Sequence, residues 1–433
     1  MDDTLIRPAV RVSGEIVVPG DKSISHRAVI LGSIAEGRTQ IVGLAPGDDN
    51  RRTIELFRAM GVSIKEAPHN TVFIDGVGMY GLKEPEDVLY AGNSGTTARL
   101  MMGLLSAQPF FSVITGDESL RTRPMARVTE PLTEMGATIY GRKNASYLPV
   151  SIKGESLKGI NYRLPVASAQ VKSSLLLAGL YATGETVVEE PQRTRDHTER
   201  MLALFGANIT RDELRVRILP ATGLKGRHLR IPGDISSAAF FLVAASVLED
   251  SEVVIRDVGL NPMRCGIVDI LKKMGACIEI FNIKEECGEP VGDIIVKEAP
   301  LKGIELGRAE LVAAIDEFPL LCVCAVFAEG RTTIREAEEL RVKESDRIEA
   351  MAEALKKLGV EVEELEDGIV IEGRGKGRLK GGVRLETRGD HRIAMALSIM
   401  ALNTEDGIEL DDTECVAVSY PDFYKDLEEV VVR

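Results

Sequence analysis

The sequence has no tryptophan, and aromatic residues make up only 4% of its 433 positions. Its six cysteines all lie at or after residue 265, form no C-x-x-C pair and have no histidine at zinc spacing. We therefore expect reduced thiols and no bound metal.

No run of 18 or more apolar residues is present, so no membrane-spanning helix is expected. The start, Met1-Asp-Asp-Thr-Leu5, lacks the basic and apolar regions of a signal peptide, which predicts a cytoplasmic protein.

Positive charge is in the minority. The chain has 53 lysines and arginines against 67 aspartates and glutamates, a net charge of −14. This balance argues against general affinity for nucleic acid or an anionic membrane. A single basic cluster is usually solvated surface, but several in comparable places predict a shared anionic ligand. Four occur here: Arg121-x-Arg123-x-x-x-Arg127, Arg193-x-Arg195, Arg341-x-Lys343-x-x-x-Arg347 and Arg388-x-x-His391-Arg392.

The stretch Val18–Arg27 predicts an anion site at the start of a helix. A strand-like run stops at Pro19-Gly20, and an apolar helical run begins at Ala28. Lys22, Ser23 and Arg27 then lie in the first turns, where free backbone N–H groups carry positive partial charge. An ordinary capped helix with solvated charges is the alternative interpretation.

The chain contains internal repeats. Five expected helices are each followed by the same three-residue pattern: a hydrophobic residue, a glycine, and then valine or alanine. The glycines of successive patterns lie 75, 70, 69 and 84 residues apart. A glycine there fits the left-handed conformation that ends many helices. The sequence Ala35-Glu-Gly-Arg-Thr39 also returns letter for letter at 328–332, and Pro19-Gly-Asp21 returns at 232–234. The five glycines are Gly61, Gly136, Gly206, Gly275 and Gly359.

These repeats predict an α/β chain that arose by duplication, with six repeats in total. Each half is expected to hold three βαβαββ units, the sixth being truncated after Arg392. The expected domains are 20–232 and 1–19 plus 233–433, with a cleft and hinge between them. If the units close around a pseudo-threefold axis, the first helix of every unit begins on one face. Those helix starts together would attract phosphate and carboxylate.

Several long motifs are spread, in order, over nearly the whole chain. They are Asp21-Lys-Ser-Ile-Ser-His-Arg27, Gly92-Asn-Ser-Gly-Thr-Thr-Ala-Arg99, Leu120-Arg-Thr-Arg-Pro-Met125, Arg341-Val-Lys-Glu-Ser-Asp-Arg347 and Gly389-Asp-His-Arg392. With these motifs, the chain resembles the 3-phosphoshikimate 1-carboxyvinyltransferase (EPSP synthase) family of enolpyruvyltransferases. The resemblance implies a two-domain inverted α/β barrel (prism) with three repeats per domain.

The implied reaction moves the enolpyruvyl group of phosphoenolpyruvate to the 5-hydroxyl of shikimate 3-phosphate and releases phosphate. These two small molecules are the expected partners, no cofactor is implied, and a monomer is expected. The implied catalytic residues are Asp316 as base and Glu344 and Lys22 for proton transfer, with His391 as a further candidate. The implied shikimate 3-phosphate contacts are Lys22, Ser23, Arg27, Ser168, Ala169, Gln170, Arg195, Asp316 and Lys343. The implied phosphoenolpyruvate contacts are Lys22, Gly95, Arg123, Gln170, Arg347 and Arg392.

Each assignment has a simpler alternative. Asp316 could be a helix cap, Glu344 could belong to a surface salt-bridge network, and Gly95 could allow close helix packing. Arg211 lies at no expected helix start, so Arg211→Lys is expected to change the KM of neither substrate.

The sequence also departs from the family pattern. Val418 stands where the family often has lysine. Ser168-Ala-Gln-Val-Lys172 and Arg195-Asp-His-Thr-Glu199 resemble a subgroup known for tolerance to glyphosate, although Gly95 is kept.

Two other functions compete with this one. The sister family of UDP-N-acetylglucosamine enolpyruvyltransferases usually carries a reactive cysteine in a loop that here reads Ile114–Arg121 and has none. A non-catalytic repeat protein, or one similar to RNA 3′-phosphate cyclases, fits poorly with the acidic charge and the few aromatic residues.

Overall fold

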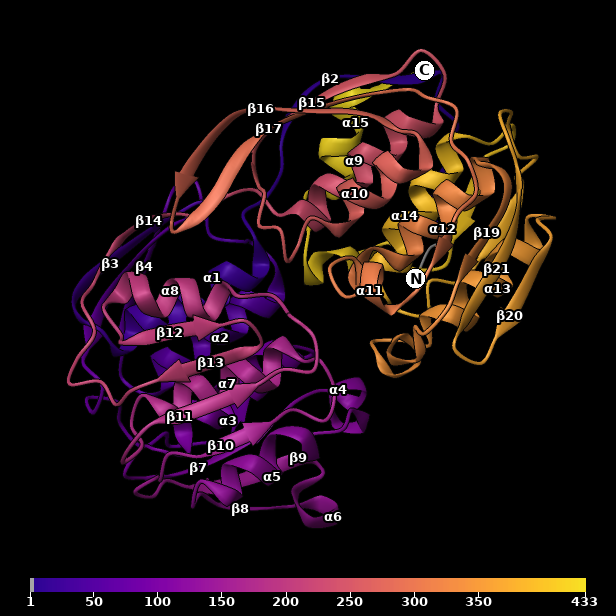
Figure 1. Ribbon diagram of the computed structural model, residues 1–433. Helices are drawn as coiled ribbons and strands as arrows, with labels where there is room; N and C mark the ends of the chain where they lie inside the picture. The colour runs from indigo at the N-terminus through magenta and orange to yellow at the C-terminus, as the bar shows by residue number, and fades with distance from the viewer. Residues whose placement is uncertain (1–3) are drawn as a thin grey trace. The chain divides into compact units, whose positions relative to one another are not determined.

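The computed structural model describes residues 4–433 (Figure 1). It is an α/β structure in which the chain divides into two compact units. The N-terminal unit consists of Gly20–Pro232 and the short segment Glu286–Glu289. The C-terminal unit consists of the described residues up to Pro19, Gly233–Glu285 and Pro290–Arg433. Within residues 4–433, no helix is long and apolar enough to cross a membrane.

The N-terminal unit repeats one four-stranded sheet three times. In each sheet the first two strands are parallel, and the other pairings are antiparallel. The first sheet is β14 (His228–Arg230), β3 (Glu36–Val42), β5 (Thr71–Val77) and β4 (Ser63–Ala67). The second is β6 (Leu89–Tyr90), β7 (Phe111–Thr115), β9 (Tyr147–Lys153) and β8 (Thr138–Gly141). The third is β10 (Asn161–Arg163), β11 (Thr186–Glu189), β13 (Arg215–Ile218) and β12 (Ile209–Asp212).

Three inner helices of this unit are buried along most of their length. They are α1 (Lys22–Ile34), α3 (Gly95–Leu105) and α7 (Ala169–Gly179). Asp21, Ser94 and Ser168 cap them, each side chain accepting a hydrogen bond from a backbone N–H of the first turn. The other helices are α2 (Asp48–Ala59), α4 (Glu118–Thr122), α5 (Ala126–Glu134), α6 (Arg142–Ala145) and α8 (His197–Phe205).

The C-terminal unit has three sheets of related topology. The first is β16 (Cys277–Glu286), β17 (Glu289–Lys297), β15 (Glu252–Gly259), β2 (Arg11–Val17) and β24 (Val431–Val432). The second is β18 (Glu305–Leu306), β19 (Glu329–Ile334), β21 (Gly368–Arg374) and β20 (Val362–Leu365). The third is β1 (Thr4–Ile6), β23 (Ile408–Leu410) and β22 (Val383–Leu385).

Its inner helices are again buried and pack against one another (Figure 1). They are α9 (Ile235–Val247), α12 (Phe318–Phe327) and α14 (His391–Leu402). Asp234 and Asp390 cap α9 and α14, and the short η1 (Ile315–Glu317) leads into α12. The remaining helices are α10 (Gly266–Met274), α11 (Arg308–Leu311), η2 (Glu338–Val342), α13 (Arg347–Lys357), η3 (Glu414–Val418) and α15 (Phe423–Val430).

The sixth repeat does not end at Arg392, contrary to the expectation from the sequence. It continues through α14, β23 and α15 but lacks the closing hairpin. In that position β1, from the other end of the chain, pairs antiparallel with β23. Similarly, β2 lies parallel to β15, as β14 lies parallel to β3 in the N-terminal unit. The N-terminal strands therefore complete two sheets of the C-terminal unit.

The five repeated glycines all have the expected left-handed conformation, with φ between +74° and +105°. At the end of α8, Gly206 has φ +97°, and its N–H donates to Ala203 O over 3.0 Å. A Cβ on Gly206 would meet nothing within 4 Å. Backbone strain is therefore the main penalty that any other residue would meet here.

We expect Gly206→Ala to lower the free energy of unfolding by about 1–2 kcal/mol, the cost of a left-handed conformation for a residue with a Cβ. Urea unfolding monitored by circular dichroism measures this change. An unchanged midpoint would show that the end of α8 relaxes to another conformation at no cost.

Candidate active site

In the N-terminal unit, candidate residues gather where α1, α3 and α7 begin. The Asp21 side chain accepts from Ile24 N over 2.8 Å, which fixes the first turn of α1. Lys22 Nζ lies 2.5 Å from Asp49 Oδ2, and Asn50 Nδ2 donates to Lys22 O over 3.1 Å. Lys22 is therefore held by two neighbouring residues of α2, and Ser23 follows it in the same turn.

Arg27 lies one turn further along α1 and is buried. Its guanidinium donates to Thr198 Oγ1 (2.5 Å), Ser173 Oγ (2.9 Å) and Ser23 O (2.8 Å). Burial lowers the pKa of Arg27 to about 10, although the carboxylate of Glu199 opposes this shift. Arg27 therefore remains a cation at neutral pH, with its orientation fixed by neutral hydroxyl groups.

Two further guanidinium groups cover the start of α3. A Cβ on Gly95 would lie 2.7 Å from Arg99 Nη1 and 3.7 Å from Arg123 Nη1. Arg99 Nη1 donates to Gln170 Oε1 over 2.7 Å, which links α3 to the start of α7. Arg123 Nη2 donates to Asn93 Oδ1 over 2.5 Å. Gly95 thus does more than allow helix packing, because any side chain there would displace Arg99.

The remaining N-terminal candidates lie at α7 and in the loop before α8. Ser168 Oγ accepts from Val171 N over 3.4 Å, and Ala169 begins α7. Arg195, in the loop, is half-buried, and its charge contributes to the lowered pKa of Arg27. The unit therefore brings together Lys22, Ser23, Arg27, Gly95, Arg123, Ser168, Ala169, Gln170 and Arg195 on adjoining helix starts and loops.

In the C-terminal unit, Asp316 lies beside two arginines. Its carboxylate oxygens are 3.8 Å from Arg347 Nη1 and 3.9 Å from Arg392 Nη2. Arg392 Nη1 also donates to Asp316 O over 3.2 Å. Glu344 Oε2 accepts from Arg347 Nη2 over 2.7 Å. Two carboxylates and two guanidinium groups therefore form one cluster at the starts of α12, α13 and α14.

Arg347 is almost fully buried, and hydrogen bonds to Asp390 fix its orientation. Arg347 Nε and Nη2 donate to the two oxygens of Asp390 over 2.8 and 3.3 Å. Burial alone would lower the pKa of Arg347, but the carboxylates of Asp390 and Glu344 outweigh it and raise that pKa. Nearby Lys343 is half-buried, and burial lowers the pKa of its ammonium group despite the opposing charge of Asp316.

This arrangement can bind anions and move protons, and the comparisons with known proteins identify the family. A model of the family described as EPSP synthase (3-phosphoshikimate 1-carboxyvinyltransferase) matches residues 6–427. The chain belongs to the EPSP synthase family.

Curated relatives of the chain carry the same description. The 3-phosphoshikimate 1-carboxyvinyltransferase of Geotalea uraniireducens is 54% identical over 432 residues, which cover 100% of both chains. That of Syntrophotalea carbinolica is 52% identical over 424 residues, 98% of each chain. Both matches span the family fold from end to end.

Solved structures agree with this assignment. The EPSP synthase from Acinetobacter baumannii superposes with a TM-score of 0.89 at 47% identity, covering 99% of this chain and 98% of the other. The enolpyruvyl transferase NikO from Streptomyces tendae has a TM-score of 0.79 at 19% identity, covering 98% and 96% of the two chains. The second likeness concerns the fold alone. The predicted two-domain inverted α/β barrel of the EPSP synthase family is confirmed.

The four basic clusters are not uniform in this EPSP synthase family member. Arg127 and Arg193 are exposed. Arg341 pairs with Asp346 (2.7 Å) and Glu364 (3.0 Å), and Arg388 donates to Glu349 and Glu353. By contrast, Arg123 and Arg347 are buried and Arg392 is half-buried. Each cluster combines residues directed toward the candidate site with residues that fix neighbouring elements.

Sequence reasoning missed a buried hydrogen-bond network that contacts Arg392. Arg392 Nη1 donates to Ser236 Oγ over 3.2 Å, and Glu317 Oε1 accepts from Arg264 Nη1 over 3.1 Å. Ser236 Oγ in turn donates to Glu317. Arg264 lies outside the four clusters and follows no motif, so only the repeated Pro-Gly-Asp-x-Ser sequence ending at Ser236 pointed to this region. In the N-terminal unit, Arg99 was missed although it ends a recognised motif.

The structure does not make Arg211 a neutral surface position, because its side chain is only 17% exposed and pairs with two buried carboxylates. Arg211 Nη2 lies 2.9 Å from Glu190 Oε2, and Nη1 lies 3.1 Å from Glu199 Oε1. Its position in a strand, away from any helix start, gave no sign of these partners.

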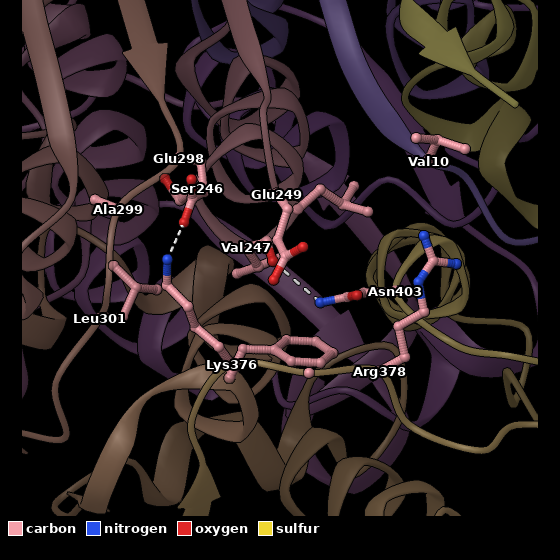
Figure 2. Close-up of a pocket in the computed structure, with 13 residues that line it drawn as sticks. Val10, Ser246, Val247, Glu249, Glu298, Ala299, Leu301, Lys376, Arg378 and Asn403 are labelled. Carbon is pink, nitrogen blue, oxygen red and sulfur yellow. Dashed lines mark hydrogen bonds and ion pairs between the residues drawn. The ribbon is translucent and has the colours of Figure 1, made fainter.

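A cavity of about 230 Å³ in the C-terminal unit is lined by none of the predicted site residues (Figure 2). It lies where α9, α12 and α14 end, at Val247, Phe327 and Asn403. Figure 2 shows Asn403 directed toward Val247 O, to which it donates over 3.0 Å, and Lys376 directed toward Glu298. Asn403 therefore satisfies a backbone carbonyl at the end of α9. The opposite ends of the three inner helices carry the candidate site.

Proposed function

We propose that these two groups of residues perform the EPSP synthase reaction in this chain. The protein is a transferase of the shikimate pathway that moves the enolpyruvyl group of phosphoenolpyruvate to the 5-hydroxyl of shikimate 3-phosphate. The products are 5-enolpyruvylshikimate 3-phosphate and phosphate. The observation that carries the residue assignments is the cluster in which Arg347 and Arg392 flank Asp316.

In the first step, the 5-hydroxyl oxygen adds to the central carbon of phosphoenolpyruvate. The hydroxyl proton goes to a base, for which we propose the Asp316 carboxylate. The methylene carbon gains a proton, for which we propose Glu344, with Lys22 and His391 as further candidates. In the second step, that carbon loses a proton, the double bond re-forms and the C–O bond to phosphate breaks.

Both substrates carry several negative charges, which explains the residue types. We propose that Lys22, Gly95, Arg123, Gln170, Arg347 and Arg392 bind phosphoenolpyruvate. Planar guanidinium groups suit carboxylate and phosphate because they donate two parallel hydrogen bonds. Fixed cations also stabilise the charge that develops on the departing phosphate.

For shikimate 3-phosphate we propose Lys22, Ser23, Arg27, Ser168, Ala169, Gln170, Arg195, Lys343 and Asp316. The first six lie in or next to the first turns of α1 and α7, where backbone N–H groups favour anions. Arg195 lies in the loop before α8. Lys343 and Asp316 then contact the sugar-like ring on the side of the reacting hydroxyl.

The organisation of the chain also enters the proposal. We propose that 20–232 and 1–19 plus 233–433 are two domains that move about a hinge on binding, the segment Glu286–Glu289 remaining with the first. We further propose a monomeric cytoplasmic enzyme without metal or cofactor, since one chain supplies every proposed contact. Size-exclusion chromatography with light scattering, and activity assays with EDTA, test these points.

Phosphate release tests the proposed function. We expect the protein to release phosphate from phosphoenolpyruvate when shikimate 3-phosphate is present, and not when UDP-N-acetylglucosamine replaces it. EDTA should leave the rate unchanged. Release with the UDP sugar alone, or no release with either acceptor, would contradict the proposal.

A further inference from the structure

Next to the proposed shikimate 3-phosphate site, the N-terminal unit contains four charged residues that pair with one another and have no role in the proposed reaction. Lys172 of α7 is 0% exposed, and its Nζ lies 2.7 Å from Glu199 Oε1 and 3.1 Å from Glu190 Oε2. Arg211 bridges the same two carboxylates from the outside. We refer to Lys172, Glu190, Glu199 and Arg211 as the buried charge cluster.

The buried charge cluster fixes the loop that carries Arg195. Lys172 Nζ donates to Thr194 O over 3.5 Å. Glu190 Oε1 accepts from Thr194 N over 3.2 Å and also from the Thr194 hydroxyl. Thr194, the residue before Arg195, is therefore hydrogen-bonded through its backbone and its side chain to Lys172 and Glu190, which are themselves buried and paired.

The cluster also fixes the helix that orients Arg27. Glu199 is preceded by Thr198, and Lys172 is followed by Ser173. The hydroxyl groups of Ser173 and Thr198 lie 2.6 Å apart, and both accept from Arg27. The Lys172–Glu199 pair therefore holds α7 and α8 together at the point where the two hydroxyl groups hold Arg27.

A contribution to stability alone does not explain why such a cluster is present. Burying an ion pair costs solvation, and apolar residues of similar volume often serve a core equally well or better. Here the charged groups contact or adjoin the residues that hold Arg27 and Arg195. Both arginines are proposed to bind shikimate 3-phosphate. The Glu199 carboxylate also opposes the lowering of the pKa of Arg27 that burial causes, which helps to keep this arginine protonated.

We propose that Lys172 is a positioning residue for shikimate 3-phosphate. Through Glu190 and Thr194 it places Arg195, and through Glu199 and α8 it places Arg27. This inference rests on the proposed function of these two arginines. It predicts a larger effect on shikimate 3-phosphate than on phosphoenolpyruvate, because Arg27 and Arg195 are assigned to shikimate 3-phosphate alone. The contacts of Arg123 and Gly95 do not involve the cluster.

Lys172→Met keeps the length of the side chain and removes its charge. We expect the KM for shikimate 3-phosphate, and its Kd measured by calorimetry without the second substrate, to rise on the order of 10-fold. Misplacing a group by about 1 Å can cost up to ~100-fold. The KM for phosphoenolpyruvate and kcat should change little. Lys153→Met, at a lysine that is 68% exposed in the same unit, should match the wild type.

Two more variants separate positioning from stability. Lys172→Met with Glu199→Gln removes one buried charge of each sign, so we expect recovered thermal stability but a raised KM for shikimate 3-phosphate. Arg211→Lys keeps the charge but cannot donate to both carboxylates through two separate nitrogens. It should raise the same KM less, and it decides the question if Lys172→Met does not fold.

The outcomes are distinct. A wild-type protein without phosphate release would overturn the proposed function and this inference with it. An active wild type beside variants with unchanged affinity for shikimate 3-phosphate would overturn the inference alone. The same conclusion would follow if both KM values rose equally, or if the double variant regained affinity together with stability.

Discussion

Asp316→Asn should lower kcat by about 10²- to 10⁴-fold, the range that a general base typically contributes. Asparagine keeps the shape of the side chain but cannot accept the proton of the 5-hydroxyl. Affinity for shikimate 3-phosphate should fall only modestly, because the proposed phosphate contacts lie in the N-terminal unit. Steady-state phosphate release gives kcat, and calorimetry with shikimate 3-phosphate alone gives the affinity.

Asp406→Asn is the matched control, since Asp406 is exposed in the same unit and should leave both quantities unchanged. The structure already weakens the alternative that Asp316 is a helix cap. Glu317 occupies the N-cap position of α12 and Ala314 that of η1. A variant with wild-type kcat would nonetheless remove Asp316 from the mechanism.

The repeats made the fold predictable. Each glycine at the end of a repeated helix has a positive φ, as its position in the pattern required. The predicted helix starts at Lys22, Gly95 and Ala169 lie within a few residues of their observed positions. A repeated sequence imposes the same local structure several times, so an error in one copy is corrected by the others.

Contacts between distant segments were not predictable. Lys172 and Glu190 are 18 residues apart, and Arg211 pairs with Glu190 from 21 residues away because β12 places it there. The repeats led us to expect residues 1–19 with the C-terminal half, but they did not indicate that Thr4–Ile6 completes the sheet of the sixth repeat. Pairings of this kind have no periodic signature, because they depend on how finished elements pack.

The basic clusters illustrate the same limit within one motif. Arg341 and Arg347 lie six residues apart, yet the first pairs with partly exposed carboxylates and the second is buried against Asp390. Sequence spacing could identify the motif but could not tell which arginine is buried and which pairs with partly exposed carboxylates. That distinction determines which substitution tests the phosphoenolpyruvate site.

Arg392→Lys should raise the KM for phosphoenolpyruvate by about 10- to 150-fold, because losing one charge-assisted hydrogen bond costs roughly 1.5–3 kcal/mol. Lysine keeps the positive charge but loses the planar group that donates two hydrogen bonds. Arg392 is a better choice than Arg347, whose replacement would also leave the buried Asp390 without its partner. Arg392 contacts Ser236 Oγ and the backbone oxygen of Asp316, and lies 3.5 Å from the buried Glu317 carboxylate. Glu317 would still keep Arg264 as a partner.

The KM for shikimate 3-phosphate should change far less, since Arg27 and Arg195 of the N-terminal unit bind that substrate in our proposal. Arg331→Lys, at an arginine that is 67% exposed in the C-terminal unit, controls for the change of residue type. If Arg392→Lys and Arg331→Lys behave alike, Arg392 does not bind phosphoenolpyruvate. If Arg392→Lys raises both KM values equally, the substitution has also disturbed Asp316, which our proposal places against shikimate 3-phosphate. Only a selective rise assigns Arg392 to the departing phosphate or the carboxylate of phosphoenolpyruvate.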